Sequence, residues 1–303
     1  PGPGRFREFT QIDADIVGSK NNLADAEMCS LISDTLIKCG LEKKDFVINL
    51  SNRKLIQGLI NQLKINSAKQ KLTVIRAIDK LDRIGMSGVE QLLKKGRKDQ
   101  SGDFTKGADL SDAQASEVIN FLKLKDISDI KNILTDKLAI EGINEIQKIL
   151  EGIKYSGYES QINFNPTVVR GLEYYTGAIF EANLTFKVKN LKGKEVEFGS
   201  IGGGGRYDNL VSRFNKIDLP ATGISIGLDR LIFALTQLEK INYSNKEPVI
   251  ICILDEKYLP KYYEILKELR NQDINSEIYL GDSSLKSQLK YADKRNSPAV
   301  ILC

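Results

Sequence analysis

Polar and apolar side chains alternate over residues 4–18, GRFREFTQIDADIVG, which is the period of an extended chain. We expect Arg5 and Arg7 to share one face of an extended segment. The strand that follows should present a polar row to a cleft and an apolar row to a core. The polar row comprises Gln11, Asp13 and Asp15, and the apolar row comprises Ile12, Ala14 and Ile16.

A second alternation, over residues 223–231 (GISIGLDRL), changes its period partway. Ile224, Ile226 and Leu228 predict a buried strand that runs directly into an amphipathic helix. Arg230 then falls in the first turn of that helix, where a cation is unfavourable against the helix dipole. Either an anion held jointly by the helix amides and the guanidinium, or a salt bridge to a neighbouring acid, would explain its position.

Residues 170–181, RGLEYYTGAIFE, form a third strand-like segment, flanked by glycines. In an extended chain Arg170 and Tyr174 share a face and Tyr175 lies on the other. A guanidinium and a phenol on one face suit an anion beside a small polar group. An amphipathic strand with two packing tyrosines is the alternative.

Four consecutive glycines occupy positions 202–205 within SIGGGGRYDNL. They remove side-chain bulk where a ligand or another backbone must approach the main chain. A tight hairpin or bulge would explain two glycines more easily than four. No Lys-Ser or Lys-Thr follows, so this is not a Walker loop, and the setting is not that of a dinucleotide fingerprint.

Residues 64–150 have a mainly helical pattern, with apolar positions at 74, 75, 78 and 81. Ser111 and Gln114 have the spacing of a capping box ahead of another apolar run. The basic run KKGRK at 94–98 predicts a solvated loop, with phosphate contact as the alternative. Residues 249–303 alternate apolar strands with helical runs in β-α-β-α-β order, which predicts a parallel sheet.

The composition limits the chemistry. The 303 residues are 41% hydrophobic, enough for two or three domains, and the net charge of +4 leaves nucleic-acid binding to local patches. No apolar run is long enough to span a membrane. The four cysteines have no CxxC spacing, which suits a reducing compartment and no structural zinc. The absence of histidine excludes Ser-His-Asp and Cys-His catalysis within this sequence.

The four segments just described resemble, in order, sequence blocks of histidyl-tRNA synthetases, which are class II aminoacyl-tRNA synthetases. GRFREFTQIDADIVG is similar to the loop and second strand of motif 2, and GISIGLDRL is similar to motif 3. RGLEYYTGAIFE and GGGGRYDNL resemble the two histidine-specific blocks. The resemblance implies an α+β fold in which an antiparallel sheet is flanked by helices.

The family activates histidine with ATP and Mg²⁺, then esterifies tRNA-His, so the resemblance assigns roles to ATP-binding residues. Arg170 matches the catalytic arginine at the α-phosphate. Arg230 matches the motif 3 arginine that grips the γ-phosphate and packs over adenine, and Phe9 matches the aromatic residue on the other side of adenine. Arg5 and Arg7 match loop positions near the ATP phosphates or the tRNA acceptor end.

The resemblance also assigns histidine-binding residues. Asp15 matches the carboxylate that faces the imidazole, and Tyr175 matches the hydroxyl at the other ring nitrogen. Gln11 and Tyr174, with Arg170, match the residues around the backbone groups of the amino acid. The glycines at 202–205, Gly203 and Gly204 in particular, would form the pocket floor, where any β-carbon would crowd the ligand.

The resemblance further implies a domain order. We expect the catalytic core in residues 1–63 and 151–245, a helical insertion domain that clasps the acceptor stem in 64–150, and part of an anticodon-binding domain in 246–303. Motif 1 and the first strand of motif 2 have no counterpart, so we expect an inactive fragment of a homodimer, cytoplasmic or, in a eukaryote, mitochondrial. Two alternatives remain open: a regulatory subunit of ATP phosphoribosyltransferase, and a synthetase-like tRNA-sensing domain of a stress kinase.

Overall fold

The chain divides into two compact units, residues 1–240 and 241–303. The computed structural model describes residues 4–99, 102–171, 174–189, 193–210, 217–241, 247–281 and 284–303. The sequence-based boundary after residue 245 lies close to this division. No helix in the described ranges is long and apolar enough to cross a membrane.

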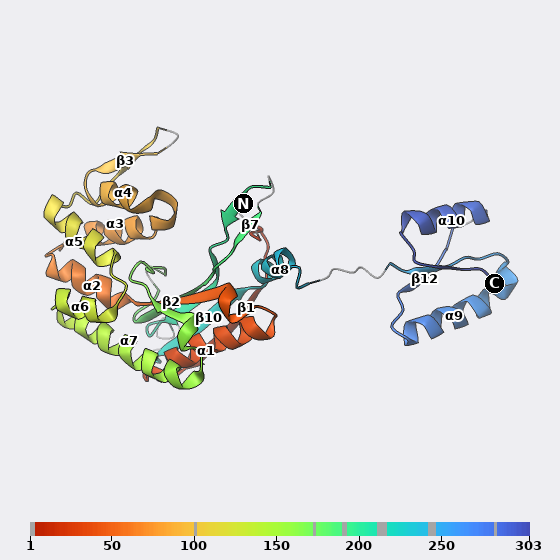
Figure 1. The fold of residues 1–303 in the computed structure, drawn as a ribbon, viewed down its shortest axis with the longest axis horizontal. Coiled ribbons are helices and arrows are strands. Elements are labelled where there is room, and N and C mark those ends of the chain that lie inside the picture. The colour runs from red at the N-terminus through yellow and green to blue at the C-terminus, as the bar shows by residue number, and fades with distance from the viewer. Residues whose placement is uncertain are drawn as a thin grey trace. The chain divides into compact units, whose positions relative to one another are not determined.

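A six-stranded sheet organises the first unit, in the order β1-β10-β9-β6-β2-β5 (Figure 1). Its neighbouring strands are antiparallel except for the parallel pair β2 and β5. The expected mainly antiparallel sheet flanked by helices is confirmed. The strands are β1 (Gln11–Val17), β2 (Phe46–Asn52), β5 (Ile162–Phe164), β6 (Ala178–Leu184), β9 (Ser200–Arg206) and β10 (Ala221–Gly227).

The strand register separates the sheet into an apolar face and a polar face, because directly opposed residues project to the same side. Ile224 opposes Gly204, and Gly204 opposes the buried Phe180. Helices α1 (Leu23–Lys38) and α7 (Lys137–Ser156) cover this apolar face and contact each other. The polar face carries the row of β1 that the alternation predicts, although the apolar row of this edge strand is only partly buried, with Ile12 40% exposed.

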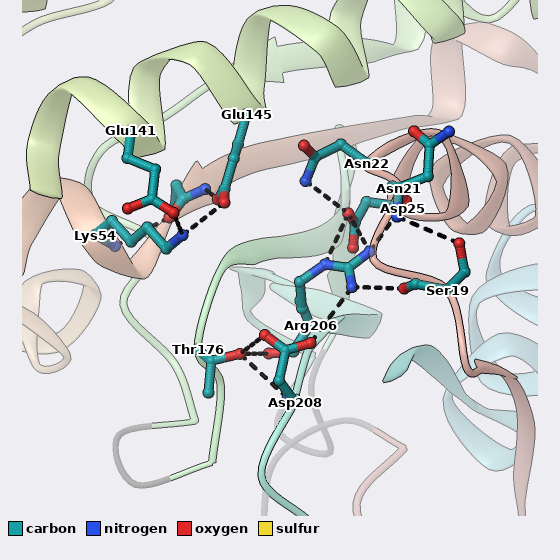
Figure 2. A network of polar contacts seen from close by, with 11 residues as sticks. Ser19, Asn21, Asn22, Asp25, Lys54, Glu141, Glu145, Thr176, Arg206 and Asp208 are labelled. Carbon is teal, nitrogen blue, oxygen red and sulfur yellow. Dashed lines mark hydrogen bonds and ion pairs between the residues drawn. The ribbon is translucent and has the colours of Figure 1, made fainter. Parts of the chain in front are cut away.

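A buried ion pair joins α1 to β9 on the apolar face (Figure 2). The Arg206 guanidinium donates from Nε and Nη2 to Asp25 Oδ2 at 3.0 and 2.8 Å. It also donates to the carbonyls of Ser19 and Asn21, and its Nη1 lies 3.4 Å from Asp208 Oδ1. Because every donor has an acceptor, the guanidinium is satisfied although the residue is only 4% exposed.

Of the helices between the two halves of the sheet, the one that begins at Asp112 has the start that the sequence predicts. The capping box is confirmed, since Ser111 and Gln114 exchange side-chain and backbone hydrogen bonds. The apolar run near residue 78 is divided, because Leu81 begins a new helix. These helices are α2 (Arg53–Gln62), α3 (Ala68–Ile78), α4 (Leu81–Leu93), α5 (Asp112–Leu122) and α6 (Ile127–Ile133).

Helix α7 belongs to the packing of the sheet although most of it lies within the predicted insertion. It contacts α1, α2 and β2. Lys54 on α2 pairs with Glu141 and Glu145 on α7, at 2.5 and 2.6 Å, as Figure 2 shows. The helix ends at Gly157, which has a positive φ of 78° and so terminates it without strain.

The basic run at 94–98 is not a loop, because residues 96–98 pair with residues 104–106. Strands β3 (Gly96–Lys98) and β4 (Phe104–Lys106) form a hairpin. Gly96 has a φ of 121°, and a β-carbon there would overlap the Thr105 carbonyl. The glycine therefore permits the close strand pairing, which the charge pattern alone did not indicate. A second hairpin pairs β7 (Lys187–Lys189) with β8 (Glu195–Glu197).

Two segments that were expected to be extended, those before β1 and β6, are not strands. Residues 4–10 are not extended along a strand: Gly4 has a φ of 63°, and Thr10 exchanges hydrogen bonds with the start of α8 (Leu228–Gln237). Arg170 and Tyr174 do not share a strand face either. Gly171 has a φ of 69° and its carbonyl accepts from both tyrosine amides, so β6 begins only at Ala178.

The second unit confirms the predicted β-α-β-α-β order with a parallel sheet, β12-β11-β13. Tyr262 and Leu266 of α9 pack on Ile251 and Ile278 of the sheet. Its elements are β11 (Val249–Ile251), α9 (Leu259–Asn271), β12 (Ser276–Ile278), α10 (Leu285–Lys294) and β13 (Val300–Ile301). The described residues also include the short 3₁₀ helices η1 (Lys43–Asp45), η2 (Glu159–Gln161) and η4 (Glu256–Tyr258).

Candidate active site

A pocket of about 390 Å³ lies over the polar face of the sheet, where β1, β9 and β10 meet the start of α8. It draws residues from segments more than 200 positions apart in the sequence, so the tertiary fold creates it. Six residues predicted for the site line it: Arg5, Phe9, Gln11, Arg170, Gly203 and Arg230. Its other lining residues are Gly4, Phe6, Thr10, Ser200, Ile201, Gly202, Ser225, Gly227 and Asp229.

The glycine run forms an interior strand, with β10 on one side and β6 on the other, and not a hairpin. A β-carbon at Gly203 would lie 2.8 Å from the Phe180 carbonyl, and one at Gly204 would overlap the Gly223 carbonyl. The strands therefore pack too closely for side chains. Gly203 is on the polar face, whereas Gly204 faces the Phe180 ring on the helical side.

Arg230 lies in the first turn of α8, and main-chain carbonyls accept hydrogen bonds from its guanidinium. Its Nε and Nη2 donate to the carbonyls of Ser200 and Phe198, both at 2.7 Å, and its guanidinium lies 4.2 Å from the Phe198 ring centroid. Burial, followed by repulsion from Arg5 and Arg170, lowers the pKa of Arg230 to about 10. Three cations therefore converge here, and an anion would relieve their repulsion.

Arg170 lies in the wall of the pocket with its side chain about half exposed. Its Nη2 is 2.8 Å from Oε1 of Glu181, a β6 residue whose side chain is only 9% exposed. Burial raises the pKa of Glu181, and the charge of Arg170 opposes that rise. A buried carboxylate thus faces an arginine that remains accessible to a ligand.

Asp15 lies outside the pocket lining but on the same face of the sheet. The hydroxyl of Tyr207 donates a short hydrogen bond to Asp15 Oδ1. Burial and this carboxylate raise the pKa of Tyr207, so it remains a neutral donor. Gly223 lies directly opposite Asp15 on β10, and a β-carbon there would overlap the Asp15 carboxylate.

Tyr174 and Tyr175 join Tyr207 in one aromatic cluster. Tyr174 stacks on Tyr207 with ring centroids 5.0 Å apart, and it meets Tyr175 edge to face at 5.1 Å. Burial, with Tyr174 and Asp15 nearby, raises the pKa of Tyr175 to about 12. The structure therefore brings Asp15 and both predicted tyrosines together. It does not bring in Arg7, which is exposed and absent from the pocket lining.

Sequence reasoning assigned no role to Tyr207, Ser225, Asp229 or Glu181. Three of them contact predicted site residues, and Asp229 contacts Thr10 of the pocket lining. Ser225 accepts a short hydrogen bond from the Gln11 amide, and Asp229 accepts one from the Thr10 amide at 2.7 Å. Alternation gives a partial signal, because positions 203, 205 and 207 share a face. The partner of each residue depends on strand register, which the sequence pattern does not supply.

Comparison with known proteins relates the chain to one family. A model of the histidyl-tRNA synthetase family matches residues 1–231. The histidine–tRNA ligase of Pelagibacter ubique is 54% identical over all of the chain and 66% of its own length. Among solved structures, a histidyl-tRNA synthetase from Nostoc sp. matches 98% of the chain and 67% of its own, at 28% identity and a TM-score of 0.69. An ATP phosphoribosyltransferase regulatory subunit/histidyl-tRNA synthetase from Bacillus halodurans matches 97% and 68%, at 20% identity and a TM-score of 0.70, which supports the fold alone.

Proposed function

Because the chain belongs to the histidyl-tRNA synthetase family, we propose that it carries most of the site at which histidine is activated by ATP and transferred to its tRNA. The chain spans slightly less than two thirds of the curated relatives it matches, 66% and 64% for two of them. The observation that carries the proposal is the convergence of Arg5, Arg170 and Arg230 on one pocket of the polar face.

The arginine pocket suits the triphosphate of ATP. Attack on the α-phosphate spreads negative charge over phosphoryl oxygens, and fixed cations stabilise that charge most effectively. Arg230 is already held by two carbonyls, so little reorganisation is needed when an anion arrives. Phe9 lines the same pocket and is 59% exposed, which leaves its ring available to a planar base.

The Asp15–tyrosine cluster suits an imidazole. Asp15 supplies an acceptor for a ring N–H, and Tyr207 donates to the same carboxylate and so fixes its position. The neutral Tyr175 hydroxyl would serve the other ring nitrogen. A site that hydrogen-bonds both nitrogens strongly rejects apolar side chains of similar size.

Magnesium would enter this site on the phosphates of ATP. No group of three or more potential metal-binding side chains converges among the described residues. Mg²⁺ is usually held by substrate phosphates and water with few protein ligands, so the ion would need few side chains of this chain. The ion would neutralise phosphate charge, while the arginines position the phosphates.

The chain also resembles a regulatory subunit in fold. The residues of the candidate site must therefore decide between an enzyme and a non-catalytic regulator. A regulator that senses histidine needs the Asp15 cluster but has no need of an arginine pocket for a triphosphate. The presence of Arg170 and Arg230 together in one pocket therefore favours catalysis. From the family membership we further propose that tRNA-His is the second substrate. We also propose that the protein is a homodimer and lies in the cytoplasm.

Histidine-dependent exchange of pyrophosphate into ATP tests the proposed activity. A polypeptide extended to the full length of the relatives should support exchange with histidine and not with phenylalanine. Pyrophosphate exchange at the same rate with either amino acid, or no exchange at all, would contradict the proposal.

A further inference from the structure

Glu181 is a buried ionisable group to which the proposed reaction gives no part. It lies on β6, on the polar face of the sheet, directly opposite Gly203 of the pocket. Its residue exposure is 7%, so its carboxyl is largely removed from water. Burying a carboxylate is costly unless a partner offsets the lost hydration, so its neighbours define its role.

The neighbours of Glu181 connect it to two of the pocket arginines. Arg170 forms the 2.8 Å ion pair with it. Burial raises the pKa of Glu181, and Arg170 and Ser200 oppose that rise. The Ser200 carbonyl accepts from Arg230 at 2.7 Å. The negative charge of Glu181 in turn favours the charged form of Arg230. One carboxylate is therefore shared by a cluster of cations.

Arg170 lies between two cavities. Its ion pair with Glu181 can therefore fix the direction in which its guanidinium points. It lines the large pocket and also a small polar hollow of about 90 Å³, whose wall includes Glu181, Asn49 and Asn183. A guanidinium has five N–H donors in a rigid fork. With Nη2 in an ion pair with Glu181, the guanidinium can present its other N–H donors to a ligand in a fixed direction.

We propose that Glu181 is a positioning residue that holds Arg170 in the orientation needed to receive the phosphates of the nucleotide. The inference rests on the proposed function. In this role Glu181 acts through Arg170 and touches no substrate. Its exposed acidic neighbours, Asp79 and Asp82, line the small hollow but do not replace it, since neither forms an ion pair with Arg170.

A double-mutant cycle measures this dependence in the full-length polypeptide. Glu181→Gln keeps the shape and removes the charge, so kcat for exchange should fall roughly 10- to 100-fold, as expected when a catalytic group is misplaced by about 1 Å. KM for histidine should stay within about twofold. In an Arg170→Ala background the same change should alter kcat by less than about threefold. Equal losses in both backgrounds would overturn the proposal.

Labelling of Arg170 with phenylglyoxal, followed by peptide mass spectrometry, tests the contact without requiring activity. The labelling rate should rise several-fold in Glu181→Gln, because the guanidinium loses its buried partner, and should be unchanged in the control Asp82→Asn. An unchanged rate in Glu181→Gln would overturn the proposal. If Glu181→Gln does not fold, Glu181→Asp provides the comparison, since it keeps the charge but shortens the reach.

The two measurements separate the inference from the proposed function. If the parent protein shows no exchange, the proposed function fails, and the labelling rates still decide whether Glu181 holds Arg170. If exchange is present and the labelling rate does not change, the function stands and the positioning role is wrong.

Discussion

Gly223 illustrates how a residue without a side chain can determine the position of a functional group. It lies opposite Asp15 in the β1–β10 pair, and a β-carbon would overlap the Asp15 carboxylate. We expect Gly223→Ala to displace Asp15 and to raise KM for histidine about tenfold or more, with KM for ATP nearly unchanged. Steady-state pyrophosphate exchange with each substrate varied in turn measures both values.

Gly227→Ala is the matched control for this substitution. Gly227 lies on the same strand and face, but a β-carbon there would be 3.5 Å from Arg230, an ordinary contact distance. Its KM for histidine should remain that of the parent. If Gly223→Ala leaves KM for histidine unchanged, Asp15 does not contact the amino acid in the way proposed.

At the scale of elements, the Asp25–Arg206 pair fastens helix α1 to strand β9. Asp25 is fully buried, and removing one partner leaves the other charge uncompensated. Asp25→Ala should lower the free energy of unfolding by about 3–5 kcal/mol. Urea denaturation followed by circular dichroism measures the change.

An exposed pair on the same helix supplies the comparison. Lys38 and Asp34 are 2.8 Å apart, with side chains 75% and 39% exposed. Lys38→Ala should lower the free energy of unfolding far less than Asp25→Ala does, because water and salt screen an exposed pair. If Asp25→Ala and Lys38→Ala lower the free energy of unfolding by similar amounts, burial does not determine how much the Asp25–Arg206 pair stabilises the fold.

The stability contributed by the interactions of Glu42, which connect the chain after α8 to the segment before β2, should depend on pH. Hydrogen bonds from Lys44 and Lys240 lower the pKa of the Glu42 carboxyl to about 2. A lowered pKa gives stability that is present above the ordinary value near 4.5 and is lost as pH falls through about 2. Glu42→Gln should therefore make the thermal midpoint less dependent on pH between about 4.5 and 2. A slope equal to that of the parent would contradict this.

At the scale of the whole molecule, every residue that lines the pocket over the polar face belongs to the unit formed by residues 1–240. We expect that unit alone to fold and to bind ATP within about threefold of the affinity of residues 1–303. Isothermal titration of both polypeptides makes the comparison. A much weaker affinity for the shorter polypeptide would show that residues 241–303 contribute to the site.

Sequence patterns predicted the elements with regular periods and failed where glycine redirected the chain. The alternation at Ile224 and Ile226 correctly gave a strand that leads into a helix. The same rule wrongly extended the strand after Arg170, because the positive φ of Gly171 starts a turn. The contact between Tyr207 and Asp15 was beyond sequence reasoning, since it depends on the register of strands 192 residues apart.

The close packing of β9 between its neighbours has a consequence for redesign. Gly202 and Gly203 contribute only main chain to the pocket, so these two positions offer no side-chain atoms that a substitution could trim. Broader amino-acid specificity would have to come from Asp15 or the tyrosines. A β-carbon at either glycine would press on a carbonyl of a neighbouring strand, so the demands of folding and of ligand shape constrain the same two positions.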